Sequence, residues 1–367
     1  MPLLEPAAKR IMPHFADERA LRHLTKRCRT VEALACADLE TEARECALDA
    51  SGLHELRTSV CAAHAPRAES ALAIHARELA CVDALVTTGL AELDWLLGGG
   101  LAAGEVTELI GRPGAGKSQL CMLACAAQAA AGDSAGGCAL FVQTCASGFS
   151  AERTYAMLRA AQPGLSRAHS KARLDERLRV IGAPRLPELL RALDELNGQL
   201  RGLGEAAAGA AGSGAAGEAG AEHPRSWLGG LRLVVVDSAY AALSSEYRSA
   251  SSSAGGAQLA RLQRLLREIA ARHRIAVLVT NACLSPAGGG GPAGRDEVAA
   301  ALGHAWSHTA HTRLVVHGGG GAPGGARQIR LAKRSFSPRP VRADGAAVSF
   351  TVTSDGQGVE ARRVEAQ

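Results

Sequence analysis

Eight consecutive residues of this sequence have the types and the spacing that hold phosphate groups. Residues 111–118 read Gly-Arg-Pro-Gly-Ala-Gly-Lys-Ser and fit the pattern G-x-x-x-x-G-K-[ST] in full. Glycines at these positions let backbone N–H groups converge on phosphate oxygens at a helix N-terminus. In this pattern the lysine reaches the β- and γ-phosphates, and the last hydroxyl is a ligand for Mg²⁺. The motif predicts a nucleoside triphosphate site with Mg²⁺, formed by Gly111, Arg112, Pro113, Gly114, Ala115, Gly116, Lys117, Ser118 and Gln119.

The neighbouring residues predict the elements that present the motif. Residues 106–110 are an apolar, β-favouring run directly before it, and residues 118–127 read as a helix directly after it. A second run of branched apolar residues, 231–236, ends at Asp237. A buried strand of this kind presents a carboxylate at its carboxyl end, so we predict that Asp237 supports the Mg²⁺ ion and, with Lys117, forms the catalytic pair.

Two further strand ends carry amides. The run 275–280 is followed by Asn281, which could sense the γ-phosphate or simply end the strand, and we favour the first reading. The run 138–142 is followed by Gln143 and then Cys145. An ATPase needs a carboxylate or an amide to orient the attacking water, so Gln143 is a candidate for that role and Cys145 is not.

Composition adds few constraints. The formal charge of +5 is too mild to indicate a polyanionic partner by itself. The basic residues between 313 and 342 have no acid among them, which is compatible with a solvated face, a phosphate-facing surface or a subunit contact. The ten cysteines show no pairing suited to zinc. No signal peptide or membrane-length apolar span is visible, so we expect an intracellular protein with reduced thiols and no membrane partner.

The composition divides the chain into domains. We expect a disordered tail over 1–17, a small all-α domain over 18–65 with N-caps at Thr30 and Asp38, and an Ala-rich linker over 66–86 that could be helical. Residues 87–355 alternate β-like and helical runs, which predicts an α/β core with a mostly parallel twisted sheet. Gly- and Pro-rich inserts, expected to be disordered, lie at about 202–222, 283–298 and 317–327, and a tail covers 356–367.

Several segments resemble a known family. Residues 88–108, Thr-Gly-Leu-Ala-Glu-Leu-Asp-Trp-Leu-Leu-Gly-Gly-Gly-Leu-Ala-Ala-Gly-Glu-Val-Thr-Glu, resemble the entry segment of the RecA-like recombinases in their eukaryotic form. Residues 303–314, with Trp306 and a Thr-Arg-Leu triplet, resemble a stretch near the end of that family's core. Residues 331–335, the run before Ser238 and the helices after residue 18 look most like the D-type paralogue of the strand-exchange recombinase. The resemblance covers about residues 18–350.

The resemblance implies a RecA-like phosphate-loop ATPase core that uses ATP and Mg²⁺ and acts on single-stranded or branched DNA. It implies a role in homologous recombination and double-strand break repair in the nucleus, within hetero-oligomers of recombinase paralogues. One paralogue would bind the N-terminal region and another the ATPase core. By position, Arg153 matches an arginine that lies against adenine. Segments 244–256 and 283–302 match the two DNA-facing loops, which makes Tyr247, Arg248 and Arg295 candidate DNA contacts.

The departures from the family pattern are equally informative. Active recombinases carry a glutamate where this chain has Cys145, and an amide where it has Ala282. The connector lacks the Phe-x-x-Ala peptide that links recombinase subunits into filaments. We therefore expect an ATP-binding mediator with weak DNA-dependent hydrolysis. The alternative is an ATP-liganded structural adaptor that does not contact DNA, and an active strand-exchange recombinase is the least favoured reading.

Overall fold

The protein is described from a computed structural model, which divides into two compact units, Met1–Arg77 and Glu78–Gln367. The structure describes residues 3–15, 18–65, 68–81, 85–131, 137–145, 148–212, 227–247, 252–284, 299–300, 302, 306–318, 326–334, 347–353 and 359–364.

The N-terminal unit is a bundle of short helices around a leucine-rich core. Its helices are α1 Leu4–Ile11, α2 Glu18–Arg27, α3 Val31–Cys36, α4 Leu39–Cys46 and α5 Ala50–His64. The hydroxyl of Thr30 accepts a hydrogen bond from the Ala33 N–H at 3.2 Å, as the predicted N-cap requires. Asp38 stands at the start of α4, where its carboxylate accepts from the Thr41 hydroxyl. Helix α6, Ala71–Cys81, follows within the predicted linker.

The first residues belong to this bundle, contrary to the expectation of a disordered tail over 1–17. Helix α1 begins at Leu4, whose side chain is fully buried with those of Leu24, Leu34 and Leu53. Leu4 N–H also donates to the Arg29 carbonyl at 3.0 Å. The apolar residues Leu4, Ala7, Ala8 and Ile11 recur at helical spacing, a short signal that the prediction of a tail missed, and their burial depends on partners supplied by α2, α3 and α5.

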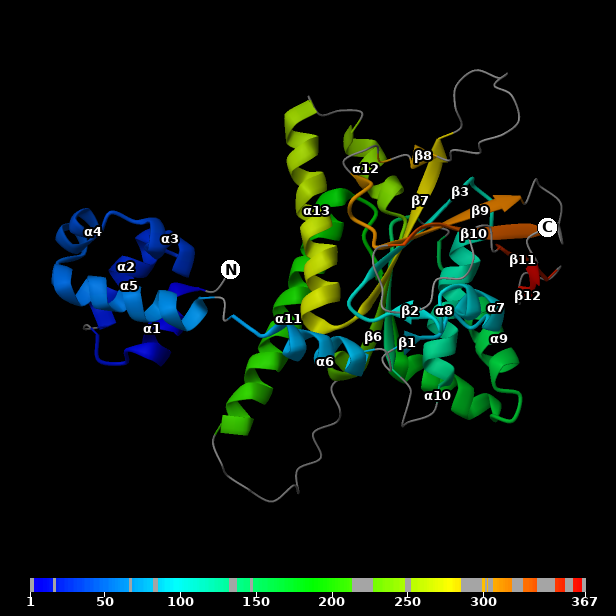
Figure 1. The fold of residues 1–367 in the computed structure, drawn as a ribbon, viewed down its shortest axis with the longest axis horizontal. Helices are drawn as coiled ribbons and strands as arrows, with labels where there is room; N and C mark the ends of the chain where they lie inside the picture. Colours follow the sequence, from blue (N-terminus) through cyan, green and yellow to red (C-terminus); the bar gives the residue numbers. More distant parts are fainter. Residues whose placement is uncertain are drawn as a thin grey trace. The chain divides into compact units, whose positions relative to one another are not determined.

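The larger unit is built on a 10-stranded sheet, which confirms the predicted α/β architecture (Figure 1). Its strands β5-β4-β6-β7-β3-β9 run parallel in this spatial order, and β10, β11 and β12 continue it antiparallel from β9. The strands are β3 Val106–Gly111, β4 Cys138–Gln143, β5 Leu178–Gly182, β6 Leu231–Asp237, β7 Ala276–Leu284, β8 Ala299–Ala300, β9 Thr312–Gly318, β10 Arg327–Arg334, β11 Ala347–Val352 and β12 Val359–Val364. A separate ribbon pairs β1 Leu85–Val86 with β2 Leu101–Ala102.

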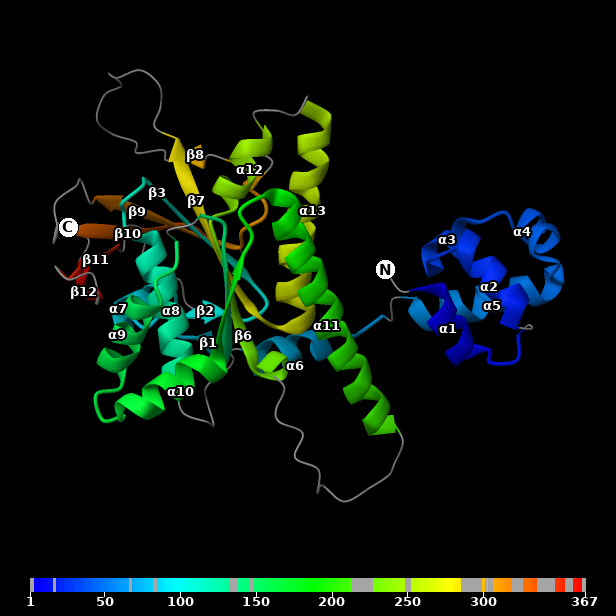
Figure 2. The same cartoon turned by 180° about the vertical axis from the view of Figure 1, so that it is seen from behind.

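Helices cover both faces of the sheet (Figures 1 and 2). One face carries α7 Ala91–Leu96, α8 Lys117–Ala130, α9 Ala151–Ala161 and α10 Arg167–Arg177, and the other carries α11 Leu186–Gly212, α12 Ala239–Tyr247 and α13 Ser252–His273. A short 3₁₀ turn, Trp227–Gly230, precedes β6. Because side chains alternate along a strand, Leu278 packs on the α8 side while Val277 and Val279 pack on the α13 side.

Two predicted boundaries differ from the structure. Helix α11 continues to Gly212, inside the insert expected over 202–222. Alanine favours helix strongly enough to extend α11 despite the interspersed glycines. Strand β12 occupies the tail expected over 356–367 and pairs along its length with β11. Strand β12 is stabilised by pairing with β11, so its own residues carry no local sequence signal for a strand. In the described part of the chain, no helix has both the length and the apolarity needed to cross a bilayer.

Candidate functional site

The predicted phosphate loop lies at the carboxyl edge of the sheet, between β3 and α8. Strand β3 ends at Gly111 and α8 begins at Lys117. Gly114 and Gly116 have φ angles of +78° and +98°, the left-handed region in which glycine is unstrained. A Cβ at Gly116 would also lie 3.1 Å from the Phe350 ring of β11. Both the backbone conformation and the nearby ring therefore require glycine at this position.

The first turn of α8 is open toward the loop. Gly116 is its N-cap and provides no side chain that could cap the first N–H groups. The helix behind this turn is anchored, since every residue from Leu120 to Ala130 is buried. Unsatisfied N–H groups at a fixed helix N-terminus form an anion-binding site.

Lys117 points back into the loop that it follows. Its Nζ donates to the Gly111 carbonyl at 2.8 Å and to the Arg112 carbonyl at 3.0 Å. Burial lowers the pKa of Lys117 from its ordinary value, and the nearby Asp237 carboxylate acts in the opposite direction. A half-buried ammonium whose hydrogen bonds go to carbonyl oxygens is well placed to gain from an incoming phosphate charge.

Asp237 ends β6 on the same edge and the same face as α8. Its Oδ1 accepts a hydrogen bond from the Thr280 hydroxyl of β7, which fixes the carboxylate. Asp237 is 6% exposed, and its Oδ2 is buried with no hydrogen-bond partner in the described structure. A buried carboxylate oxygen without a partner is unfavourable unless a cation or its water shell completes it. These residues fit Mg²⁺ beside the phosphate loop.

Strand β4 brings the remaining polar candidates to Asp237. Gln143 is the register partner of Asp237, so both side chains point to the α8 face. The Thr144 hydroxyl donates to the Ser238 carbonyl at 2.8 Å and accepts from the Ser238 N–H at 2.7 Å, which ties the ends of β4 and β6 together. Cys145 follows and is exposed. Backbone geometry thus presents Cys145 at the site edge, where the family pattern has a glutamate.

Asn281 lies on the opposite face of the sheet, which corrects the expectation that it senses the γ-phosphate. Asn281 lies two and four residues after Val279 and Val277 on β7, so its side chain points to the same face of the sheet, toward α13. It is fully buried. Its Nδ2 donates to the Glu108 Oε1 at 2.8 Å. The strand alternation that brings Thr280 to Asp237 therefore takes Asn281 away from α8.

Glu108 is the centre of a buried polar cluster that the sequence reading did not assign. Its carboxylate is fully buried and accepts from Asn281, from Trp306 Nε1 at 2.7 Å and from Arg313 Nε at 2.7 Å. The sequence signal for this cluster was a single acidic residue inside an apolar strand. A carboxylate buried in this way needs a cation and hydrogen-bond donors around it.

The cluster also changes the interpretation of the basic residues between 313 and 342. Arg313 is an internal ion-pair partner of Glu108. Lys333 donates to the Ser307 carbonyl at 2.9 Å and to the Ala310 carbonyl at 2.7 Å. Neither side chain serves as a solvated surface charge.

The other predicted residues are placed as follows. Ser118 and Gln119 lie in the first turn of α8, where Gln119 Oε1 is buried without a partner in the described structure. Arg153 is exposed in the first turn of α9, which packs against α8. Tyr247 is the last residue of α12, and its side chain lies outside the described part of the structure, as do Arg248 and Arg295.

A phosphate loop and an acidic strand end, separated in the sheet by the single strand β7, define a RecA-like phosphate-loop ATPase core. Residues 74–281 match the family model described as AAA domain, and residues 228–356 match the model described as Rad51.

Curated relatives agree with these matches. DNA repair protein RAD51 homolog 4 from Bos taurus is 31% identical over 313 residues, which cover 85% of this chain and 84% of the relative. The Mus musculus protein of the same name is 30% identical over 331 residues, covering 89% and 90%. DNA repair protein RAD51 homolog 2 from Homo sapiens is 25% identical over 346 residues, covering 88% and 82%. The chain belongs to the Rad51 family and, within it, to the D-type paralogues.

Proposed function

We propose that this protein is an ATP-binding mediator of homologous recombination and double-strand break repair. It acts in the nucleus, on DNA, within a hetero-oligomer of recombinase paralogues, and it hydrolyses ATP slowly. The names of the relatives, which are DNA repair proteins, support the repair role. The single observation that carries the proposal is a complete phosphate site with the exposed thiol of Cys145 where a water-orienting acid would stand.

In this proposal, different groups of the site bind the phosphates, the Mg²⁺ ion and the adenine of ATP. The N–H groups of the first turn of α8 bind phosphate oxygens, and Lys117 exchanges carbonyl partners for the β- and γ-phosphates. Ser118 and Asp237 Oδ2 bind the Mg²⁺ ion or its waters. When bound, Mg²⁺ neutralises phosphate charge. Arg153 lies against the adenine.

Turnover is limited because Cys145, at the described edge of the site, is not a strong acceptor for the attacking water. A cysteine is a weak hydrogen-bond acceptor and, as a neutral thiol, a poor base. Gln143 shares the face and the register of Asp237 and is the remaining polar candidate for orienting water. Ala282, the register partner of Gly111, has no amide with which to couple DNA binding to hydrolysis.

Cys145→Glu is expected to raise steady-state ATP hydrolysis. The loss of an oriented base typically lowers a rate by about 10²- to 10⁴-fold, and the substitution restores a carboxylate at that point. The measurement is phosphate release by the full chain with and without single-stranded DNA. Cys145→Met is the matched control, because methionine is similar in length to glutamate and has neither a charge nor an amide that could orient the water. Fast, DNA-stimulated turnover by the wild-type protein would contradict the proposal and favour an active recombinase.

DNA binding separates the mediator from the structural adaptor. A protein that holds the phosphate backbone through basic loop residues such as Arg248 and Arg295 loses affinity steeply as salt rises, with a slope of about −0.7 per phosphate contacted on single strands. We expect this dependence and little preference for base sequence. The test is titration of a labelled single strand over a range of salt concentrations. Absence of binding at low salt would favour the adaptor.

A further inference from the structure

The two oxygens of the Asp237 carboxylate have different surroundings. Oδ1 accepts a hydrogen bond from the hydroxyl of Thr280, a fully buried residue of β7. Oδ2 is also buried, and it has no hydrogen-bond partner in the described structure. Because Thr280 bonds to Oδ1, Oδ2 is the oxygen that remains for a cation or for water bound to that cation.

Gly148 faces Oδ2 at close range. A Cβ atom added to Gly148 would lie 3.5 Å from Asp237 Oδ2, 3.4 Å from the Cys145 carbonyl oxygen and 3.8 Å from the Asp237 carbonyl oxygen. The side chain that glycine lacks would therefore point into a space lined by three oxygen atoms. A methyl group in that space would remove room beside Oδ2 and offer no ligand to a cation.

Backbone contacts hold Gly148 in this position. Its N–H donates to the Cys145 carbonyl at 3.1 Å, which closes a turn after β4. The Thr144 N–H donates at 2.9 Å to the carbonyl of the last residue of β6, so the same turn is joined to that strand. The Ser150 N–H lies 3.3 Å from the Met122 Sδ of α8. The residues on either side of Gly148 are therefore attached to β6 and to α8.

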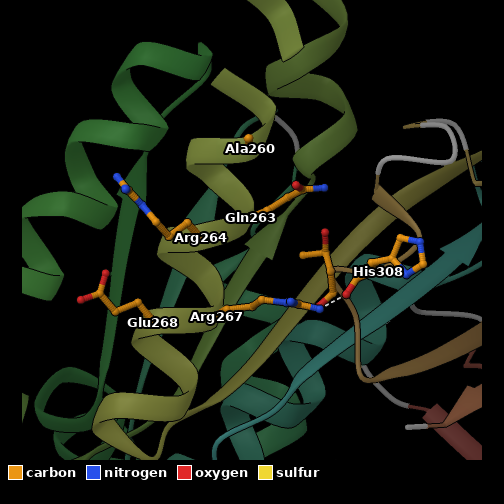
Figure 3. Close-up of a pocket in the computed structure, with 7 residues that line it drawn as sticks. Ala260, Gln263, Arg264, Arg267, Glu268 and His308 are labelled. Carbon is orange, nitrogen blue, oxygen red and sulfur yellow. Dashed lines mark hydrogen bonds between the residues drawn. The ribbon is translucent and has the colours of Figure 1, made fainter. Parts of the chain in front are cut away.

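These contacts lie on the face of the sheet that carries the phosphate loop. A larger cavity, of about 570 Å³, lies against α13 on the opposite face (Figure 3). The close-up shows Arg267 of α13 reaching toward His308. Arg264, an exposed cation, also lines this cavity. The cavity is separate from Asp237, so a change at Arg264 tests whether ATP binds on the α13 face instead.

We propose that Thr280 and Gly148 are positioning residues for the Mg²⁺ ion of the ATP site. Thr280 holds Asp237 so that Oδ2 is presented to the ion or to its waters, and Gly148 keeps the space beside Oδ2 open for them. The inference rests on the proposed function and adds the residues that set how strongly Mg²⁺ supports ATP binding. Mg²⁺ demands near-ideal octahedral geometry and retains several waters, so small changes beside its carboxylate weaken it.

The test compares ATP binding by the full chain with and without Mg²⁺. The quantity measured is the ratio of the ATP dissociation constant in excess EDTA to that in excess Mg²⁺, with Tm recorded in parallel. Thr280→Val has a similar shape and no donor, and it should lower this ratio about tenfold, the worth of one hydrogen bond to a charged group. Thr280→Ser keeps the hydroxyl and should stay within about twofold of wild type. ATP affinity in EDTA should not change.

Gly148→Ala tests the space beside Oδ2 independently. The added methyl group would meet its neighbours at ordinary contact distances of 3.4 Å or more, so Tm should stay close to that of wild type. The ratio should fall about tenfold, because the methyl group occupies room that the ion or its waters need. Gly164→Ala is the matched control, since nothing lies within 4 Å of the added atom in the turn between α9 and α10. It should change neither the ratio nor Tm.

A wild-type ratio in Thr280→Val would overturn the role of Thr280, and a wild-type ratio in Gly148→Ala would overturn that of Gly148. An equal loss of ATP affinity in EDTA and in Mg²⁺ would do the same, because it would show a purely structural role. Failure of the proposed function has a different signature. The wild-type chain would then bind ATP no more tightly with Mg²⁺ than without it, or Arg264→Ala would lower ATP affinity and place the nucleotide against α13.

Discussion

Replacing Lys117 with alanine is expected to lower the affinity for Mg²⁺ and ATP by about two orders of magnitude. The wild-type ammonium would bond two phosphate groups, and charge-assisted bonds of about 1.5 kcal/mol each correspond together to roughly a hundredfold. In the described part of the site, Lys117 is the cation that reaches into the loop, where its Nζ lies 2.8 Å from the Gly111 carbonyl. Alanine leaves that space without a donor.

The measurement is titration of ATP into the full chain, with Tm recorded in parallel. Without nucleotide, Lys117→Ala should keep a Tm close to that of wild type, and it should lose the stabilisation that ATP confers. Lys117→Arg is the matched control and should lose less affinity, although its planar fork fits a lysine position poorly. Wild-type affinity in the alanine variant would show that ATP binds elsewhere.

Glu108→Ala is expected to destabilise the larger unit by about 3–5 kcal/mol. The substitution leaves the Arg313 cation in a largely buried position without its carboxylate. It also removes the acceptor of Trp306 Nε1 and of Asn281 Nδ2. Each of these groups was removed from water when the chain folded, so no water molecule replaces the acceptor that it loses.

Urea unfolding of the full chain measures this effect. Glu108→Gln keeps the side-chain shape and one acceptor oxygen and should cost less than the alanine variant, although its NH₂ group meets a donor where the carboxylate offered its second acceptor. Combining Glu108→Ala with Arg313→Met should cost less than the sum of the two single changes, because the uncompensated cation is removed. A cost below about 1 kcal/mol for Glu108→Ala would mean that the cluster contributes little.

The sequence predicted the elements whose signals are local. The phosphate motif, the apolar run that ends at Asp237 and the alternation of strands and helices were sufficient to predict a parallel sheet with both groups at one edge. The structure confirms that arrangement. The N-cap at Thr30 was similarly readable, because the capping bond joins residues only three apart.

The features that the sequence did not predict depend on partners distant in the chain. Helix α1 is fixed by burial of Leu4 against later helices, and β12 by pairing with β11. The face occupied by Asn281 follows from the register of β7, which a run of branched residues does not reveal. The Glu108 cluster joins residues about 200 positions apart, with a separation of 205 for Arg313.

The position of Phe350 has a consequence for synthesis of the protein. Its ring in β11 packs against Gly116, and β11 is paired on its other side with β12, which ends at Val364. The phosphate loop leaves the ribosome about two-thirds of a chain length earlier than the ring that packs against it. The wall beside the phosphate loop is therefore completed only after the chain has been synthesised through residue 350. A prematurely terminated product that ends before residue 347 retains the entire phosphate motif and lacks the strand that closes it.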